Sequence, residues 1–172
     1  MSGVEATGLE ERLALLERTV RRLGNGEAVE GSPQDREALL DRLHGLQAAI
    51  DARDWDTVRS TFTADGTGYG RTGINRILAV MQAHLGGCGP TQHLLGNTRV
   101  TIEGDRARSL SSARIHHSGA GSMRGSFFEC MGEYDDRWVR TGTGWRLSHR
   151  DFDMRIRIGD FGVLRPADGP VS

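Results

Sequence analysis

The order of its periodic segments is the feature that most constrains how this chain can fold. Residues up to 85 carry apolar side chains at helical spacing, whereas apolar and polar side chains alternate in a strand-like pattern from residue 97 onward. Turns at 104–105 and 141–144 join the later segments into hairpins. Helices followed by hairpins predict an α+β domain, a cone-shaped barrel of one curved antiparallel sheet wrapped by about three helices.

The first predicted helix has a clear start and a clear apolar face. Ser32 is a favourable N-cap, Pro33 occupies the first helical position, and Asp35 lies in the first turn. The apolar stripe that follows at helical spacing is Leu39, Leu43, Leu46 and Ile50. This pattern predicts a helix that packs one face against the sheet.

Two shorter helices and four strands complete the predicted domain. The second helix begins near Asp54 and turns Trp55 and Phe62 inward, and the third covers residues 74–85 before a break at 86–90 that is rich in glycine. The predicted strands span residues 97–103, 107–117, 126–140 and 145–158. We expect a pocket between the helices and the curved sheet.

The length of 172 residues, with 37% hydrophobic and 26% charged side chains, suits one globular domain with short appendages. We place the domain at residues 32–164, after an N-terminal segment at 1–31 and before a tail at 165–172. The N-terminal segment carries a heptad seam at Leu9, Leu13, Leu16, Val20 and Leu23. This helix either packs against the domain or pairs with a second copy, and we favour a homo-oligomer, a dimer or a trimer.

Composition excludes several classes of function. All 22 basic residues are arginine, so Schiff-base chemistry and a Walker lysine are ruled out. The formal net charge of −1 argues against binding to nucleic acid. The sequence lacks an apolar run of about 18 residues and a signal peptide, so we expect no membrane contact. Two cysteines without CxxC spacing indicate the cytoplasm as the compartment.

Asp51 and His93 are the first candidates for chemistry. Asp51 lies in the last turn of the first helix, where the helix dipole disfavours a carboxylate. It is either a solvated surface acid or an acid that points into the pocket and orients a histidine. His93 follows the break at 86–90, and imidazole is well suited to act as a base at neutral pH. The alternative role for His93 is structural, as a cap for loop carbonyls.

Other polar residues flank this pair in the predicted fold. His116 and His117 are neighbours on one strand, so one of them must face the pocket if the strand is regular. Tyr69, just past the second helix, either donates a hydrogen bond to a substrate oxygen or packs in a turn. The six histidines show neither HxxxH nor HxH spacing, so we predict no metal site.

Over residues 34–164 the chain resembles SnoaL-like members of the nuclear transport factor 2-like superfamily. The segments that carry this resemblance are IDARDWD at 50–56, TQH at 91–93 with Asn97 close behind, and GWRL at 144–147. Within the superfamily it is similar to scytalone dehydratases at Asp51, Tyr69, His93 and one of His116 and His117. Hexachlorocyclohexane dehydrochlorinases and bile-acid 7α-dehydratases share the Asp–His pair. The dehydratases usually carry a tyrosine shortly before the aspartate, and this chain has none at 46–50.

The resemblance implies a cofactor-independent lyase of the dehydratase type, or an isomerase, acting on a small cyclic apolar metabolite that is polyketide- or steroid-like. His93 would take a proton from carbon while Asp51 holds the imidazole. Tyr69 and one of His116 and His117 would bind an oxygen or assist the leaving hydroxyl group. The candidate substrate-binding residues are Asn97, Trp55, Phe62, Met81, Tyr134 and Asp153.

Two alternatives remain open at this point. A SnoaL-like polyketide cyclase would rely on an acid elsewhere in the cone, for which Asp153 is the candidate. A non-catalytic ligand-binding or assembly subunit would use the same fold without the chemistry, because a fold does not fix a function. The Asp51–His93 pair separates these interpretations: a lyase needs the two side chains in contact at an open pocket.

Overall fold

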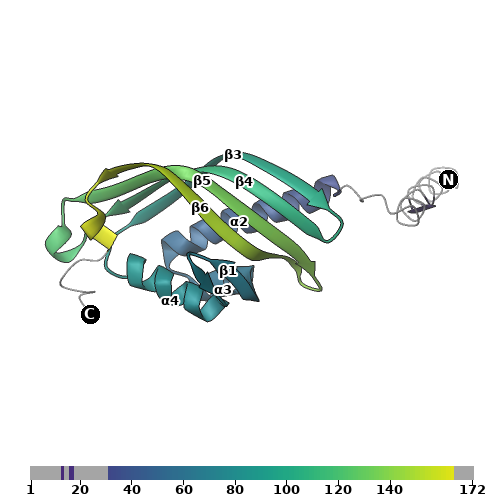
Figure 1. The fold of residues 1–172 in the computed structure, drawn as a ribbon, viewed down its shortest axis with the longest axis horizontal. Coiled ribbons are helices and arrows are strands. Elements are labelled where there is room, and N and C mark those ends of the chain that lie inside the picture. Colours follow the sequence, from purple (N-terminus) through teal and green to yellow (C-terminus); the bar gives the residue numbers. More distant parts are fainter. Residues whose placement is uncertain (1–12, 14–15, 18–30, 165–172) are drawn as a thin grey trace, which may run out of the picture.

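In the computed structural model, which describes residues 31–164 together with Leu13, Leu16 and Glu17, a curved six-stranded sheet lies against three helices (Figure 1). The helices are α2 (Pro33–Ala52), α3 (Trp55–Thr61) and α4 (Ile74–Leu85). The strands are β1 (Phe62–Gly68), β2 (Arg71–Thr72), β3 (Thr91–Glu103), β4 (Arg106–Ser118), β5 (Phe127–Thr141) and β6 (Gly144–Gly159). Short 3-10 helices, η1 (Gly121–Met123) and η2 (Phe161–Leu164), follow β4 and β6. The predicted α+β architecture is confirmed.

The sheet is mixed, and it does not close into a barrel. Its strand order is β2-β1-β6-β5-β4-β3, with antiparallel pairing throughout except between β1 and β6, which are parallel. The prediction of a wholly antiparallel barrel therefore needs correction. Residues 62–68 hold Asp65 and two glycines, which are poor strand formers, so β1 depends on its pairing with the distant β6.

Strand β3 is longer than expected and includes His93. The chain enters this strand at Thr91, directly after the break at 86–90, rather than at residue 97. The ladder with β4 shifts register between Gly96 and Arg99, where Asn97 has a φ of 50°. A β-bulge of this kind divides β3 into two halves, and the alternation of the second half alone was visible in the sequence.

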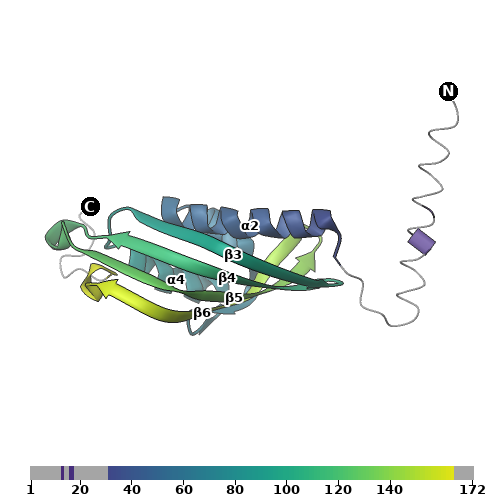
Figure 2. The same cartoon turned by 90° about the horizontal axis from the view of Figure 1, so that it is seen from above.

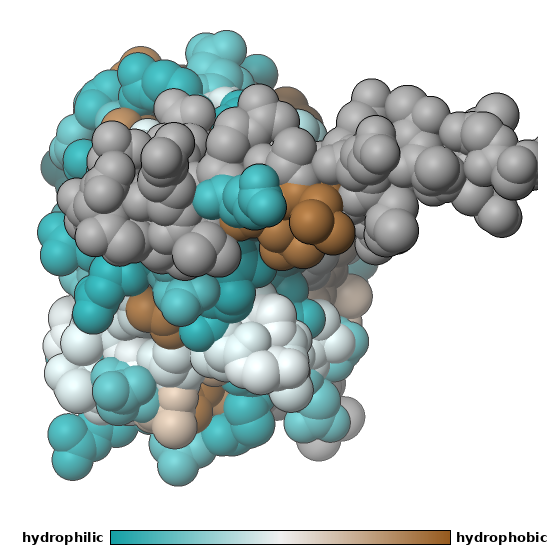
Figure 3. Space-filling model, turned by 90° about the vertical axis from the view of Figure 1, so that its right-hand side faces the viewer, coloured by the Kyte–Doolittle hydropathy of each residue, from teal (hydrophilic) through white to brown (hydrophobic). Residues whose placement is uncertain are grey.

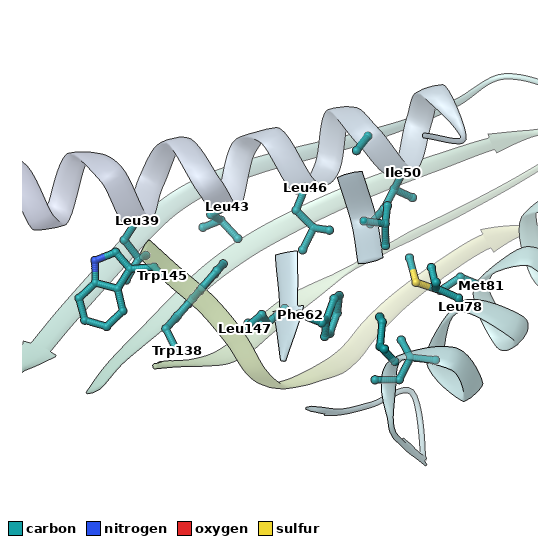
Figure 4. Packing of buried hydrophobic residues seen from close by; sticks show 14 of the residues in the cluster. Leu39, Leu43, Leu46, Ile50, Phe62, Leu78, Met81, Trp138, Trp145 and Leu147 are labelled. Atoms are coloured by element: carbon teal, nitrogen blue, oxygen red, sulfur yellow. The ribbon is translucent and has the colours of Figure 1, made fainter. Parts of the chain in front are cut away.

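Helix α2 starts and packs as its sequence predicts. Ser32 and Asp35 form a capping box, with each side chain accepting a hydrogen bond from the backbone of the other. The apolar stripe faces the sheet in Figure 4 and is buried, at 0% exposure for Leu39, Leu43 and Leu46 and 1% for Ile50. Burying each such side chain contributes about 1.5–3 kcal/mol, so this stripe fixes the helix on the sheet.

The core consists of two clusters that meet near the start of β3. The larger cluster joins α2, α3 and α4 to the sheet through Phe62, Trp138 and Leu147 (Figure 4). The smaller cluster lies under η2 and includes Ile115 and Phe128. Leu95 and Cys88 pack against both clusters, so the two clusters are joined near the start of β3.

Helix α2 runs alongside β3, which forms one edge of the sheet (Figure 2). At the N-terminal end of the helix, Arg36 donates a hydrogen bond to the Val100 carbonyl oxygen at 3.1 Å. At its C-terminal end, Arg53 donates one to the Thr91 hydroxyl at 2.9 Å. Both ends of the helix are thus tied to the same strand.

The end of the molecule that carries the hairpin turns shows mainly hydrophilic and neutral side chains outside the grey atoms (Figure 3). Among the residues that the structure describes, no helix combines the length and the apolar character needed to span a membrane. The predicted heptad seam at 9–23 and the linker after it lie outside the described residues, apart from Leu13, Leu16, Glu17 and Gly31.

Candidate active site

Asp51 and His93 are joined by two hydrogen bonds. Asp51 Oδ1 lies 2.7 Å from His93 Nδ1, and Oδ2 accepts the backbone N–H of His93 at 2.8 Å. The Thr91 hydroxyl donates a third hydrogen bond to Oδ1 at 2.8 Å. The His93 side chain is 7% exposed and that of Asp51 is 23% exposed. The last turn of α2 and the first residues of β3 therefore hold a shielded carboxylate–imidazole pair.

The electrostatics of this pair define its protonation. Burial raises the pKa of Asp51, but the hydrogen bonds from the His93 side chain, the His93 backbone and Thr91 outweigh that effect and lower it overall. Asp51 is therefore a carboxylate at neutral pH, and a carboxylate can only accept, so Nδ1 of His93 carries the proton. A proton on Nδ1 leaves Nε2 as the atom whose lone pair can accept a proton, as a base requires.

His117 is the second imidazole at the site. Its ring meets that of His93 edge to face at 5.9 Å between centroids, and its Nδ1 lies 3.3 Å from the Phe128 carbonyl oxygen. Burial lowers the pKa of His117 to about 4, with a further contribution from the nearby His93, so this ring is neutral at pH 7. Nδ1 donates to the carbonyl, and Nε2 is again an acceptor.

His116 points to the opposite face of the sheet, because successive residues of β4 alternate sides. Its side chain is 41% exposed, its ring stacks on Phe127, and its Nδ1 lies 4.0 Å from Glu129 Oε1. Of the two neighbouring histidines, the structure therefore brings only His117 to His93.

A cavity of about 350 Å³ adjoins the two imidazoles. Most of the side chains that line it are apolar, and the polar ones are three histidines, two tyrosines and a cysteine. The lining residues are Ile50, Tyr69, Val80, Met81, His84, Leu85, His93, Ile115, His117, Phe128, Cys130, Tyr134, Phe152, Met154, Phe161 and Leu164. Such a hollow suits a small apolar molecule that carries few polar groups.

Tyr69 lies in a tight hairpin turn at the cavity and has a positive φ, which is uncommon for a tyrosine. Tyr69 and Gly70 form the two-residue loop between β1 and β2, with φ values of 52° and 69°. Holding a tyrosine in the left-handed region costs about 1–2 kcal/mol, and residues with such strain cluster at functional sites. The turn directs the phenol to the cavity wall.

A buried ion pair supports the second tyrosine. Arg150 and Asp136 are both fully buried and joined by two hydrogen bonds of 2.8 and 2.7 Å. The guanidinium carbon of Arg150 lies 4.2 Å from the centre of the Tyr134 ring, which lines the cavity. When the amide oxygen of Gln47 faces the guanidinium, it accepts hydrogen bonds from the two terminal nitrogens of Arg150, at 3.0 and 3.1 Å. Helix α2 and the cavity wall thus share one polar network.

Four of the six candidate substrate-binding residues do not line the cavity, whereas Met81 and Tyr134 do. Trp55 and Phe62 pack in the larger core cluster instead. Asn97 is exposed in the bulge of β3. Asp153 alternates to the outer face of β6, where its side chain is 65% exposed and pairs with Arg155 at 2.8 Å. The acid that the cyclase interpretation needs is therefore outside the cavity.

Sequence reasoning missed several residues of the site. On β5 and β6 the lining residues Phe128, Cys130, Phe152 and Met154 alternate with outward-facing ones, and this two-residue period was readable in the sequence. Thr91 accepts from Arg53, 38 residues before it, and donates to Asp51, 40 residues before it, and no local pattern signals these contacts. Within the described part of the chain, no group of three or more His, Cys, Asp or Glu side chains is arranged to hold a metal ion.

Comparisons with known proteins agree with this architecture. The family described as SnoaL-like domain matches residues 32–151. The protein Rv2910c of Mycobacterium tuberculosis H37Rv is 33% identical over 122 residues, which cover 67% of this chain and 82% of the relative.

Three solved structures share the fold at lower identity. The Kfla4162 protein of Kribbella flavida has a TM-score of 0.69 at 22% identity and covers 77% of this chain and 97% of its own. The hexachlorocyclohexane dehydrochlorinase LinA-type3 of Novosphingobium barchaimii has a TM-score of 0.64 at 16% identity, with coverage of 75% and 94%. A candidate scytalone dehydratase of Novosphingobium aromaticivorans has a TM-score of 0.66 at 14% identity, with coverage of 73% and 87%.

Proposed function

Because the chain belongs to the SnoaL-like domain family, we propose that it is a lyase that eliminates water or halide from a small cyclic, apolar molecule. The observation that carries this proposal is the contact of 2.7 Å between Asp51 and His93 at the wall of an apolar cavity. Two solved proteins with this fold are named for eliminations, a dehydrochlorinase and a candidate dehydratase, which supports the same class of reaction.

The proton transfer follows from the tautomer of His93. Its Nε2 takes a proton from a ring carbon next to the leaving group, and the electron pair of that C–H bond forms the new double bond. The bond to the leaving group breaks, and its electron pair leaves with the oxygen or halide. Asp51 stabilises the imidazolium that forms, because its carboxylate already accepts the Nδ1 proton. The low exposure of the His93 side chain, 7%, strengthens this interaction, because charges attract more strongly away from bulk water.

Two further polar groups at the cavity, Tyr69 and His117, serve the leaving group and a substrate hydroxyl. The Tyr69 phenol is a donor that can pass a proton to a departing hydroxyl group, which then leaves as water. His117 is neutral at pH 7, so its Nε2 accepts a hydrogen bond from a substrate hydroxyl and orients it. Different side chains thus supply the base and the acid that protonates the leaving group.

A substrate panel tests the proposal. The protein is incubated with hydroxylated and halogenated polycyclic and steroid-like compounds, and loss of water or halide is followed by mass spectrometry. We expect turnover of at least one compound, abolished in His93→Gln and retained in the matched control His116→Gln, whose side chain lies on the outer face. If panel compounds bind but none is converted, the elimination is ruled out in favour of a ligand carrier. If His93→Gln keeps full activity, His93 is ruled out as the base in favour of a different one.

A further inference from the structure

Arg53 follows the last residue of α2 in a conformation that usually belongs to glycine. Its φ is 60° and its ψ is 25°, in the left-handed region. Its backbone N–H donates to the carbonyl oxygens of Ala49 and Ile50 and thereby closes the helix. A glycine would do this without strain, so the presence of arginine points to a task for the side chain.

That side chain connects the helix end to the start of β3. One terminal nitrogen, Nη1, donates to the carbonyl oxygens of Ile50 at 3.0 Å and Asp51 at 3.3 Å and to the Thr91 hydroxyl at 2.9 Å. The other, Nη2, donates to the Gly89 carbonyl oxygen at 3.2 Å. The positive guanidinium therefore lies at the negative end of α2, next to the turn that carries the Asp51 carboxylate.

The chemistry of these groups fixes the direction of the hydrogen bonds. A guanidinium can only donate, so the Thr91 oxygen must accept from Arg53. The one proton of the hydroxyl then points away from Arg53, and Asp51 Oδ1 lies 2.8 Å away to receive it. In this arrangement the carboxylate has three donors, namely the Thr91 hydroxyl and the side chain and backbone of His93. With Arg53 in place, the hydroxyl proton is therefore directed at Asp51.

We propose that Arg53 is a positioning residue for the Asp51–His93 pair and that it acts through the hydroxyl of Thr91. Its effect on turnover rests on the proposed lyase function, whereas its effect on the geometry of the pair does not. Arg53 does not line the cavity, so it contributes orientation rather than contact with substrate. Residues that orient a metal ligand without touching the metal typically change activity by about 10- to 100-fold when they are removed, and we expect an effect of that order for Arg53.

The substitution Arg53→Gly removes the guanidinium and keeps a backbone that tolerates the positive φ. We expect kcat to fall by about 10- to 100-fold with little change in KM. Arg36→Ala is the matched control, because Arg36 also ties α2 to β3 through one hydrogen bond, at the far end of the helix. If Arg53 only fastened the helix to the strand, the two variants would behave alike.

The path through Thr91 is tested by a double-mutant cycle. Thr91→Val removes the hydroxyl and leaves the Arg53 backbone untouched. It therefore tests the path even if Arg53→Gly does not fold. We expect Thr91→Val to lower kcat as Arg53→Gly does, and Thr91→Ser, which keeps the hydroxyl, to have a kcat close to that of wild type. The kcat of the double variant Arg53→Gly/Thr91→Val should be no lower than that of Thr91→Val alone. Additive losses would overturn the proposed path.

A spectroscopic measurement separates this inference from the proposed function. In protein labelled with ¹⁵N-histidine, the His93 Nδ1–H proton reports its hydrogen bond to Asp51 without any substrate. We expect its signal to shift or broaden in Arg53→Gly and Thr91→Val and to stay unchanged in Arg36→Ala. If the signal changes in the two variants while the wild-type protein binds panel compounds but converts none, the positioning is supported and the lyase is contradicted. An unchanged signal in Arg53→Gly would overturn the positioning.

Discussion

The imidazole rings of His93 and His117 meet edge to face on the cavity wall, with their centroids 5.9 Å apart. Each ring donates through Nδ1, but His93 donates to a carboxylate and His117 to the backbone carbonyl of Phe128. The carboxylate stabilises a protonated ring far better than a carbonyl does. The two histidines are therefore unequal, with His93 suited to accept a proton and His117 suited to stay neutral.

The lowered pKa of His117 makes stability depend on pH. Its pKa is about 4 in the folded protein and about 6.5 in the unfolded chain. Between these values the unfolded chain binds more protons, so stability is complete above about pH 6.5 and falls as the pH drops toward 4. We expect wild type to lose about 2 kcal/mol more than His117→Gln between pH 7 and pH 5. Urea unfolding at both pH values measures this, and equal losses would contradict it.

Asp51→Asn is expected to lower kcat by about 10⁴-fold, because an amide in place of the carboxylate favours the wrong imidazole tautomer and cannot stabilise the imidazolium. The substitution keeps the shape of the side chain, so the circular dichroism spectrum should match that of wild type. A variant that is folded and retains more than about a tenth of wild-type kcat would show that the carboxylate is not needed by the base.

Tyr69→Phe removes one hydroxyl group and leaves the strained turn with a side chain of the same shape. If the phenol protonates the leaving group, kcat for a hydroxylated substrate falls by about 100-fold or more. Stability should change by no more than about 0.5 kcal/mol, as a thermal melt can verify. With a halogenated substrate the leaving group needs no proton, so a loss of the same size there would argue against this role.

Asp136→Asn leaves the buried Arg150 without its countercharge. Burial opposes the charge on Arg150, but Asp136 beside it raises the pKa of the guanidinium, which therefore stays charged in the interior. We expect a loss of about 3–5 kcal/mol in the free energy of unfolding. The matched control is Asp135→Asn, which breaks an exposed pair with Arg108 and should lose about 0–1 kcal/mol. Similar losses in the two variants would contradict the prediction.

Local signals in the sequence predicted most of the fold. The capping box at Ser32 and the stripe from Leu39 to Ile50 specify α2 through short-range chemistry, and the glycine turns specify both hairpins. Strand β1 escaped prediction because residues 62–68 carry no alternating pattern and pair with β6, about 80 residues later. A strand of this kind is set by its partner, not by its own sequence.

The candidate site was predictable only in part. Asp51 and His93 stood out as a carboxylate at an unfavourable helix end and an imidazole after a chain break, and the structure brings them into contact. Phe62 and Asp153 were misplaced for different reasons. Phe62 points inward as predicted, but an inward side chain can face either the core or the cavity, and that of Phe62 faces the core. The outward position of Asp153 depends on the register of β6. Both questions are settled by tertiary geometry.

The bond from the His93 backbone to Asp51 has a consequence for the behaviour of the protein at high concentration. Strand β3 is the outermost strand on its side of the sheet, and a free N–H there is a template on which another polypeptide can add. The Asp51 carboxylate occupies that N–H and places a negative charge beside it. The side chain that prepares the base thus also removes one donor that a second polypeptide could use at this edge.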